Sequence, residues 1–93
     1  MCGIVGVVSK KPFGTDELVN RLKRLEYRGY DSYGVADNEG YLFKQVGEIS
    51  IKDVPRKRCE VAMAHTRWAT HGGVTQTNAH PHIACDDRIV VVH

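Results

Sequence analysis

The chain has 93 residues, of which 42% are hydrophobic and 26% charged, with a formal net charge of +2. This length fits one small domain, and the composition is that of a globular chain rather than of a disordered tail or a membrane protein. The charge is too small and too scattered to favour nucleic acid, and no apolar run approaches the roughly 20 residues of a membrane span. The sequence therefore predicts no nucleic-acid partner and no membrane partner.

The first predicted element is a strand over 2–8, whose β-branched residues indicate burial on both faces and whose glycines indicate a close neighbouring backbone. A turn is expected at 11–14. Thr15 is placed as the N-cap of a helix, because apolar residues then recur at helical spacing. This helix is expected to end near Arg28, with Gly29 as its stop.

Two short segments, 32–36 and 41–46, are rich in strand-forming residues and flank turn residues, which predicts a β-hairpin. The stretch 47–58 is expected to be a connection with one turn of helix, and its basic cluster 56–58 a solvated loop. Because several strands accompany only one clear helix, the predicted fold class is α+β.

A further strand is predicted over 59–65, followed by a polar, aromatic, glycine-terminated segment at 66–73 that is typical of a binding loop. The stretch 74–82 reads as irregular and 88–92 as a last strand. That strand reaches His93 with no polar cap, so we expect it to pair with another segment or to lie in the front part of a longer protein.

Cys2 is the first candidate for chemistry, because removal of Met1 would place its thiol beside a free α-amine. An α-amine has a reference pKa of about 7.7–8.0 and a cysteine thiol about 8.5, so the amine can take the thiol proton near neutral pH. The alternative is that Cys2 is a buried, inert residue of the strand. With Cys59 and Cys85 the chain has an odd number of cysteines and no secretion signal, which favours a reducing cytoplasm.

Four histidines and two cysteines permit a second interpretation, in which a metal is bound. The residues concerned are His65, His71, His80 and His82, with Cys59 or Cys85. Zinc ligands normally come in closely spaced pairs, and this spacing fits that pattern poorly. No cofactor is therefore expected.

Four segments together resemble the class II glutamine amidotransferases: Cys2-Gly3-Ile4-Val5-Gly6, Leu25-Glu26-Tyr27-Arg28-Gly29-Tyr30-Asp31-Ser32, Ala64-His65-Thr66-Arg67-Trp68-Ala69-Thr70-His71-Gly72 and Asn78-Ala79-His80-Pro81-His82. The opening segment is similar to any member of that family. The second and third are similar to the branch that uses fructose 6-phosphate to make glucosamine 6-phosphate.

The resemblance implies an N-terminal-nucleophile (Ntn) hydrolase fold, a four-layer αββα sandwich, of which residues 1–93 would be the N-terminal portion. It implies a transferase in which Cys2 attacks the γ-amide of L-glutamine and the ammonia passes to a sugar phosphate. The remainder of the glutaminase domain and a sugar isomerase domain are implied as partners in the same or a separate chain. A homo-oligomer is implied for the full enzyme.

By this resemblance Arg67 binds the glutamine α-carboxylate, for which a guanidinium fork is well shaped. Trp68, Thr70 and His71 would complete the pocket, and His80 would lie near it. Without the motif, a surface ion pair for Arg67 and a core position for Trp68 would be the expected roles.

Arg28 and Asp31 are expected to be structural neighbours of the site, with Arg28 pairing with Asp31 or bracing the Cys2 strand. Tyr33 departs from the family pattern, which usually has alanine there, and this bears on local packing.

The resemblance also implies an oxyanion hole from an Asn-Gly pair directly after His93, which this sequence does not contain. Each such donor contributes roughly 10²–10³ in rate, so we expect the 93 residues alone not to be a competent glutaminase. We also expect them to fold poorly, because the last strand would leave an apolar, unpaired edge. Two alternatives stay open: another ammonia acceptor, such as phosphoribosyl pyrophosphate, and a noncatalytic binding or metal-carrying module.

Overall fold

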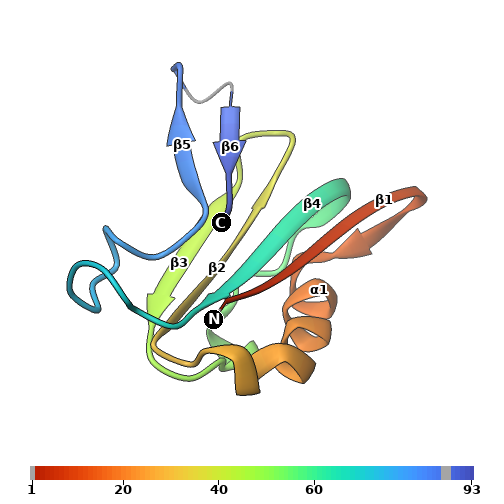
Figure 1. The fold of residues 1–93 in the computed structure, drawn as a ribbon. Helices are drawn as coiled ribbons and strands as arrows, with labels where there is room; N and C mark the ends of the chain where they lie inside the picture. Colours follow the sequence, from red (N-terminus) through yellow and green to blue (C-terminus); the bar gives the residue numbers. More distant parts are fainter. Residues whose placement is uncertain (1, 87–88) are drawn as a thin grey trace.

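The computed structural model describes residues 2–86 and 89–93, apart from the side chain of Arg28. Its main sheet is antiparallel, with four strands in the order β1-β4-β2-β3 (Figure 1). These strands are β1 (Gly3–Gly14), β2 (Ser32–Asp37), β3 (Leu42–Val46) and β4 (Arg58–Arg67). A separate antiparallel pair is formed by β5 (His82–Ala84) and β6 (Ile89–Val91). The α+β prediction is confirmed.

Burial of β1 on both faces was predicted and is wrong for the described residues. Ile4 is 49% exposed and Val8 is 83% exposed, because helix α1 (Thr15–Leu22) covers only the opposite face of the sheet. The close neighbouring backbone predicted at the glycines of this strand is also wrong, because side-chain atoms are nearest to Gly3 and Gly6 is open. A Cβ on Gly3 would lie 2.7 Å from the Cβ of Leu25, whereas a Cβ on Gly6 would meet nothing within 4 Å.

The turn expected at 11–14 is an irregularity inside β1 rather than its end. The pairing of β1 with β4 shifts register between Val8 and Phe13, and the strand then continues to Gly14. Pro12 lies in this interval and has no backbone N–H for the ladder, which accounts for a break at this point.

The helix begins where it was predicted, but Thr15 is not its cap. Its hydroxyl donates to the carbonyl of Pro55 (2.9 Å) and accepts from the N–H of Lys57 (3.0 Å), so Gly14 is the N-cap residue. α1 continues as the 3₁₀ helix η1 (Lys23–Arg28), which ends before Gly29 as predicted. None of the described helices is long and apolar enough to cross a membrane.

The hairpin of β2 and β3 is confirmed, and a buried carboxylate closes its turn. Asp37 Oδ1 accepts hydrogen bonds from the N–H groups of Glu39 (2.9 Å) and Tyr41 (2.8 Å), and its other oxygen accepts from Lys57 Nζ. Burial opposes ionisation of Asp37, but these hydrogen bonds outweigh it and lower the pKa of the carboxyl. The expectation of a solvated basic loop is therefore wrong for Lys57.

The connection after β3 contains one 3₁₀ turn, η2 (Ile51–Asp53), in agreement with the prediction. β5 was not predicted, because a three-residue strand carries too little pattern in the sequence. β6 covers Ile89–Val91 of the last strand predicted at 88–92; Val92 is described but lies beyond the strand, and Arg88 lies outside the described residues.

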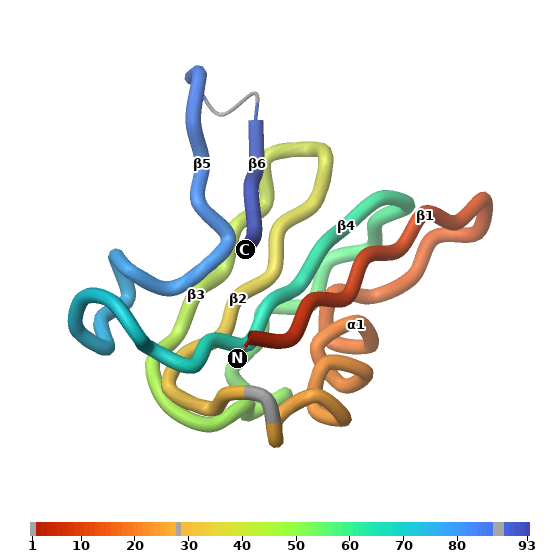
Figure 2. The backbone as a smooth tube through the Cα atoms, in the orientation of Figure 1, coloured from red at the N-terminus to blue at the C-terminus, as the bar shows by residue number. Residues whose placement is uncertain are grey.

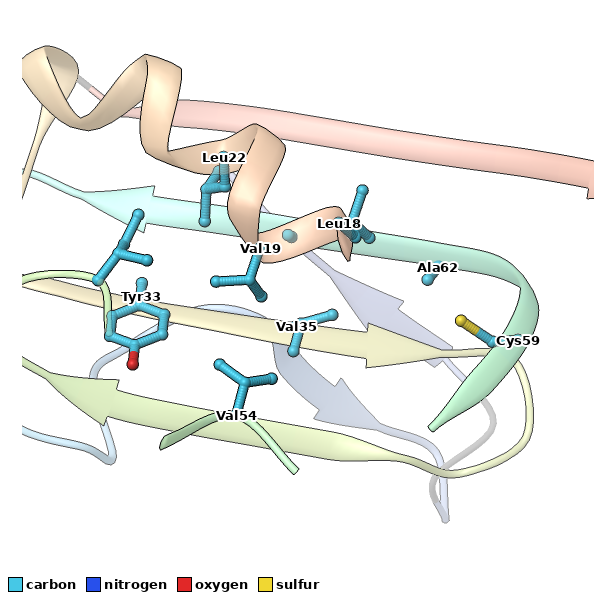
Figure 3. Close-up of a cluster of buried hydrophobic side chains, with 10 residues drawn as sticks. Leu18, Val19, Leu22, Tyr33, Val35, Val54, Cys59 and Ala62 are labelled. Atoms are coloured by element: carbon cyan, nitrogen blue, oxygen red, sulfur yellow. The ribbon is translucent and has the colours of Figure 1, made fainter. Parts of the chain in front are cut away.

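The core lies between α1 and one face of the main sheet, as Figure 3 shows for Leu18, Val19, Leu22, Tyr33, Val35, Val54, Cys59 and Ala62. Tyr33 is fully buried at its centre. Its hydroxyl donates to the carbonyl of Ser50 (3.2 Å) and accepts from the N–H of the same residue (3.3 Å). The residue that departs from the family pattern thus joins β2 to the segment before η2.

Shortening Tyr33 should reveal this role. Tyr33→Phe keeps the ring but removes both hydrogen bonds to Ser50, and should lower the free energy of unfolding by about 1–3 kcal/mol. Tyr33→Ala also leaves a cavity and should cost about 3–5 kcal/mol, as for other large aromatic residues. Urea denaturation measures both, and equal losses in the two variants would contradict a packing role for the ring.

Candidate functional site

The antiparallel pairing of β1 with β4 places the start of one strand beside the end of the other. Gly3 pairs with Thr66, so Cys2 lies next to the point where β4 ends at Arg67 (Figure 1). A hollow of about 390 Å³ opens there. It is lined by Cys2, Arg67, Trp68, Thr70, His71, Gly72, Asn78, His80, His82 and His93.

The loop 68–73 leaves β4 directly and is held at its first residues. Asp31 accepts a hydrogen bond from the N–H of Ala69 (2.8 Å) and its own N–H donates to the carbonyl of Arg67 (3.0 Å). Gly29 lies against the same backbone, since a Cβ there would come within 2.5 Å of the carbonyl carbon of Arg67. Figure 2 shows the loop running past the N-terminus toward β5.

Arg67 is not a surface ion pair, because its side chain is nearly buried, with the residue 7% exposed. Its guanidinium donates to the carbonyl of Gly73 (3.0 Å) and to that of His71. A guanidinium has five N–H donors, so it can brace the loop and still offer donors to an anion in the hollow.

Trp68 does not anchor the core. Trp68 is 46% exposed, and its ring packs edge-on against the ring of Tyr30, with centroids 5.9 Å apart. Thr70 and His71 are also exposed on the hollow. The loop therefore presents one aromatic face and several hydrogen-bonding groups beside Cys2.

The His80 ring stacks on His65, with centroids 4.4 Å apart, and meets the ring of His82 at a tilt, with centroids 4.3 Å apart. Burial lowers the pKa of His80 to about 4, and the neighbouring histidines, Arg67 and Lys44 act in the same direction. The imidazole of His80 is therefore neutral near pH 7.

The residues of the metal interpretation do not form one cluster. The rings of His65, His80 and His82 lie side by side, but Cys59 does not join them. His65 Nε2 is 2.6 Å from the carbonyl oxygen of His93, and Cys59 lies in the core. Within residues 2–86 and 89–93, no group of three or more His, Cys, Asp or Glu side chains is arranged to hold a metal ion.

Sequence reasoning assigned no role to Gly72, Asn78 or His93, and considered His82 as a metal ligand, yet all four residues line the hollow. Asn78 donates from its side-chain nitrogen to the carbonyl of Gly73 (3.1 Å), which ties the far end of the loop to the segment before β5. Asn78 belongs to the segment 78–82 that carries the resemblance, and this could have indicated that it lies near the site. The predicted pairing of Arg28 with Asp31 lies outside the described side chains.

No family model matches the chain. It is 47% identical over 102 aligned positions to glutamine–fructose-6-phosphate aminotransferase (isomerizing) of Sulfolobus acidocaldarius and 50% identical over 101 to that of Idiomarina loihiensis. The chain is similar throughout to the N-terminal part of these proteins. The alignments cover 100% of this chain but only 17% and 16% of the two relatives, so the chain spans about one sixth of their length.

Asp31 should control the order of the loop. Asp31→Ala removes the acceptor for the N–H of Ala69 and should cost about 1.5–3 kcal/mol, the range for a hydrogen bond to a charged group. Asp31→Asn retains a side-chain oxygen and should lose less. Amide hydrogen exchange at Ala69 measures the effect, and unchanged protection in Asp31→Ala would contradict it.

Proposed function

We propose that this chain is the N-terminal part of a glutaminase domain in which Cys2 is the nucleophile. One observation carries the proposal: Cys2, Arg67 and the loop 68–73 surround a single hollow, in a chain similar to glutamine–fructose-6-phosphate aminotransferases. A thiol can attack an amide carbon, and a guanidinium can bind an α-carboxylate, so these groups suit glutamine.

The reaction follows from the chemistry of an N-terminal cysteine. After Met1 is removed, the α-amine of Cys2 takes the thiol proton, directly or through one water. The sulfur forms a bond to the γ-carbonyl carbon of glutamine, the C–N bond breaks, and the nitrogen leaves as ammonia with the proton returned by the amine. Water then cleaves the thioester, which releases glutamate and restores the thiol.

Substrate binding falls to the residues on the other wall of the hollow. The guanidinium of Arg67 would hold the α-carboxylate of glutamine, since it is fixed by the carbonyls of His71 and Gly73 and presents a planar fork. Trp68 and Thr70 would enclose the aliphatic and amide parts of the substrate.

For the complete domain we propose the αββα sandwich fold of the Ntn hydrolases. The face of the main sheet away from α1 supports this, because it exposes apolar side chains: Ile4 (49%), Val8 (83%) and Val61 (38%). A second sheet from the remainder of the domain would cover them. That remainder would also supply the donors for the tetrahedral intermediate.

In the longer protein, a sugar isomerase domain would receive the ammonia and convert fructose 6-phosphate to glucosamine 6-phosphate, in a homo-oligomer. All three cysteines of the chain are free. A nucleophilic thiol persists in a reducing compartment, which supports a cytoplasmic site of action. Formation of glucosamine 6-phosphate from glutamine and fructose 6-phosphate by the full-length protein tests this acceptor, and product with phosphoribosyl pyrophosphate instead would refute it.

Cys2→Ala in the full-length protein should abolish ammonia release from glutamine. Cys2→Ser should be far slower than the unchanged protein, because a hydroxyl forms much less nucleophilic anion at neutral pH than a thiol. Cys85→Ser, at an exposed thiol, is the matched control and should keep full activity. Retention of Met1 in a fully active protein, or activity in Cys2→Ala, would refute the mechanism.

Arg67→Lys should raise the KM for glutamine by about ten-fold or more, with a smaller loss in kcat. The α-carboxylate is remote from the reacting amide, so its binding is similar in ground and transition states. Arg24→Lys, at an exposed position in η1, should change neither parameter. Equal losses in kcat and kcat/KM for Arg67→Lys would contradict a remote carboxylate clamp.

A further inference from the structure

The backbone of His93, just beyond β6, is held on both sides by histidine rings. His65 Nε2 lies 2.6 Å from its carbonyl oxygen, and its N–H donates to His80 Nδ1 at 3.3 Å. His93 lines the same hollow as Cys2. We propose that His65 and His80 are a pair of positioning residues that clamp the backbone of His93 into the wall of the Cys2 hollow.

The two hydrogen bonds fix the tautomers of both rings. A carbonyl only accepts, so His65 must carry its proton on Nε2, and His80 must leave Nδ1 unprotonated to accept an N–H. His65 is fully buried, and its Nδ1 has no hydrogen-bond partner among the described residues. A neutral ring tolerates that arrangement, whereas a protonated ring would bury an unpaired donor.

Three distant segments of the sequence build this clamp. Gly34 in β2 pairs with His65 in β4, so both lie on the face of the sheet away from α1. A Cβ on Gly34 would collide with the carbonyl oxygen of His80 and lie 3.0 Å from Cδ of Pro81. The bare backbone at Gly34 therefore lets the segment 80–81 approach until the His80 ring stacks on His65.

The charges around His80 keep it in the accepting form. Its surroundings include His65 and Arg67 from β4, Lys44 from β3 and His82 from β5, and burial together with these groups holds its pKa at about 4. Burial lowers the pKa of His65 as well. Both rings are neutral at pH 7, where the clamp has its donor and its acceptor.

The clamp matters because β5 and β6 form a sheet of their own, separate from the sheet that carries Cys2 and Arg67. Part of the hollow's wall thus belongs to a hairpin that no strand pairing among the described residues joins to β1 or β4. Two hydrogen bonds to His93, from His65 in β4 and from His80 before β5, would hold this hairpin against the main sheet. Loss of the clamp should disturb the placement of reacting groups more than the binding of substrate.

The test uses the full-length protein with His80→Leu, which removes the acceptor, and His80→Asn, a similar-sized variant whose oxygen can accept. Val54→Ala, in the core, controls for general loss of stability. His80→Leu should speed amide hydrogen exchange at His93 by about ten-fold and lower kcat for glutamine hydrolysis by about ten-fold, the equivalent of one lost hydrogen bond. KM should change little, and His80→Asn should recover much of both losses.

The kinetic readout rests on the proposed glutaminase function, whereas hydrogen exchange does not. Ammonia release by Cys2→Ala would refute the function and leave the clamp to be judged by exchange at His93. Unchanged exchange in His80→Leu would overturn the clamp. So would a fall in kcat without faster exchange, because His80 would then act on the substrate itself.

Nitrogen chemical shifts of the unchanged protein give a test that needs no variant. At pH 7 the clamp requires both His65 and His80 to carry the proton on Nε2. Finding the proton on Nδ1 of either ring would overturn the proposal.

Discussion

The pairing of β1 with β4 constrains everything else in the candidate site. Cys2 directly precedes β1, so its place depends on how that strand is paired. Pairing of Gly3 with Thr66 fixes that strand at the point where β4 ends. β4 is itself held on its other side by β2. Cys2 and Arg67 are therefore placed by the same backbone ladder.

The alternation of side chains along β4 lets one strand serve the core and the site. Ala62 and Ala64 belong to the core against α1, while His65 lies on the opposite face and contacts His93. Small residues on one side allow the helix to pack closely, and the histidine on the other side supports the hollow. A register slip of one residue would exchange these faces and destroy both functions together.

Local patterns in the sequence predicted most of the elements, and tertiary contacts account for the exceptions. The hairpin of β2 and β3 was predictable because its turn residues are adjacent in the chain. The role of Thr15 was not, because its partners Pro55 and Lys57 lie about forty residues away. The one-sided burial of β1 was equally hidden, since β-branched residues suit an exposed apolar face as well as a buried one.

In the site too, some features were predictable from the sequence and others depend on tertiary contacts. Four ordered segments were enough to predict Cys2 and the residues of the loop after β4, and the structure brings these together around one hollow. Arg67 also braces that loop by donating to the backbone carbonyls of His71 and Gly73. A pattern of side chains in the sequence cannot predict such contacts with the backbone. Likewise, Gly34 has no visible relation to His80 in the sequence, and the relation exists only once β2 and β4 are paired.

The most direct measurement is peptide mapping of the full-length protein after reaction with an electrophilic glutamine analogue. The chain offers three free thiols: Cys2 half-buried on the hollow, Cys59 in the core and Cys85 exposed. The account predicts modification at Cys2 alone, blocked by excess glutamine. Modification at Cys85 or Cys59 that glutamine blocks, with Cys2 unmodified, would contradict it.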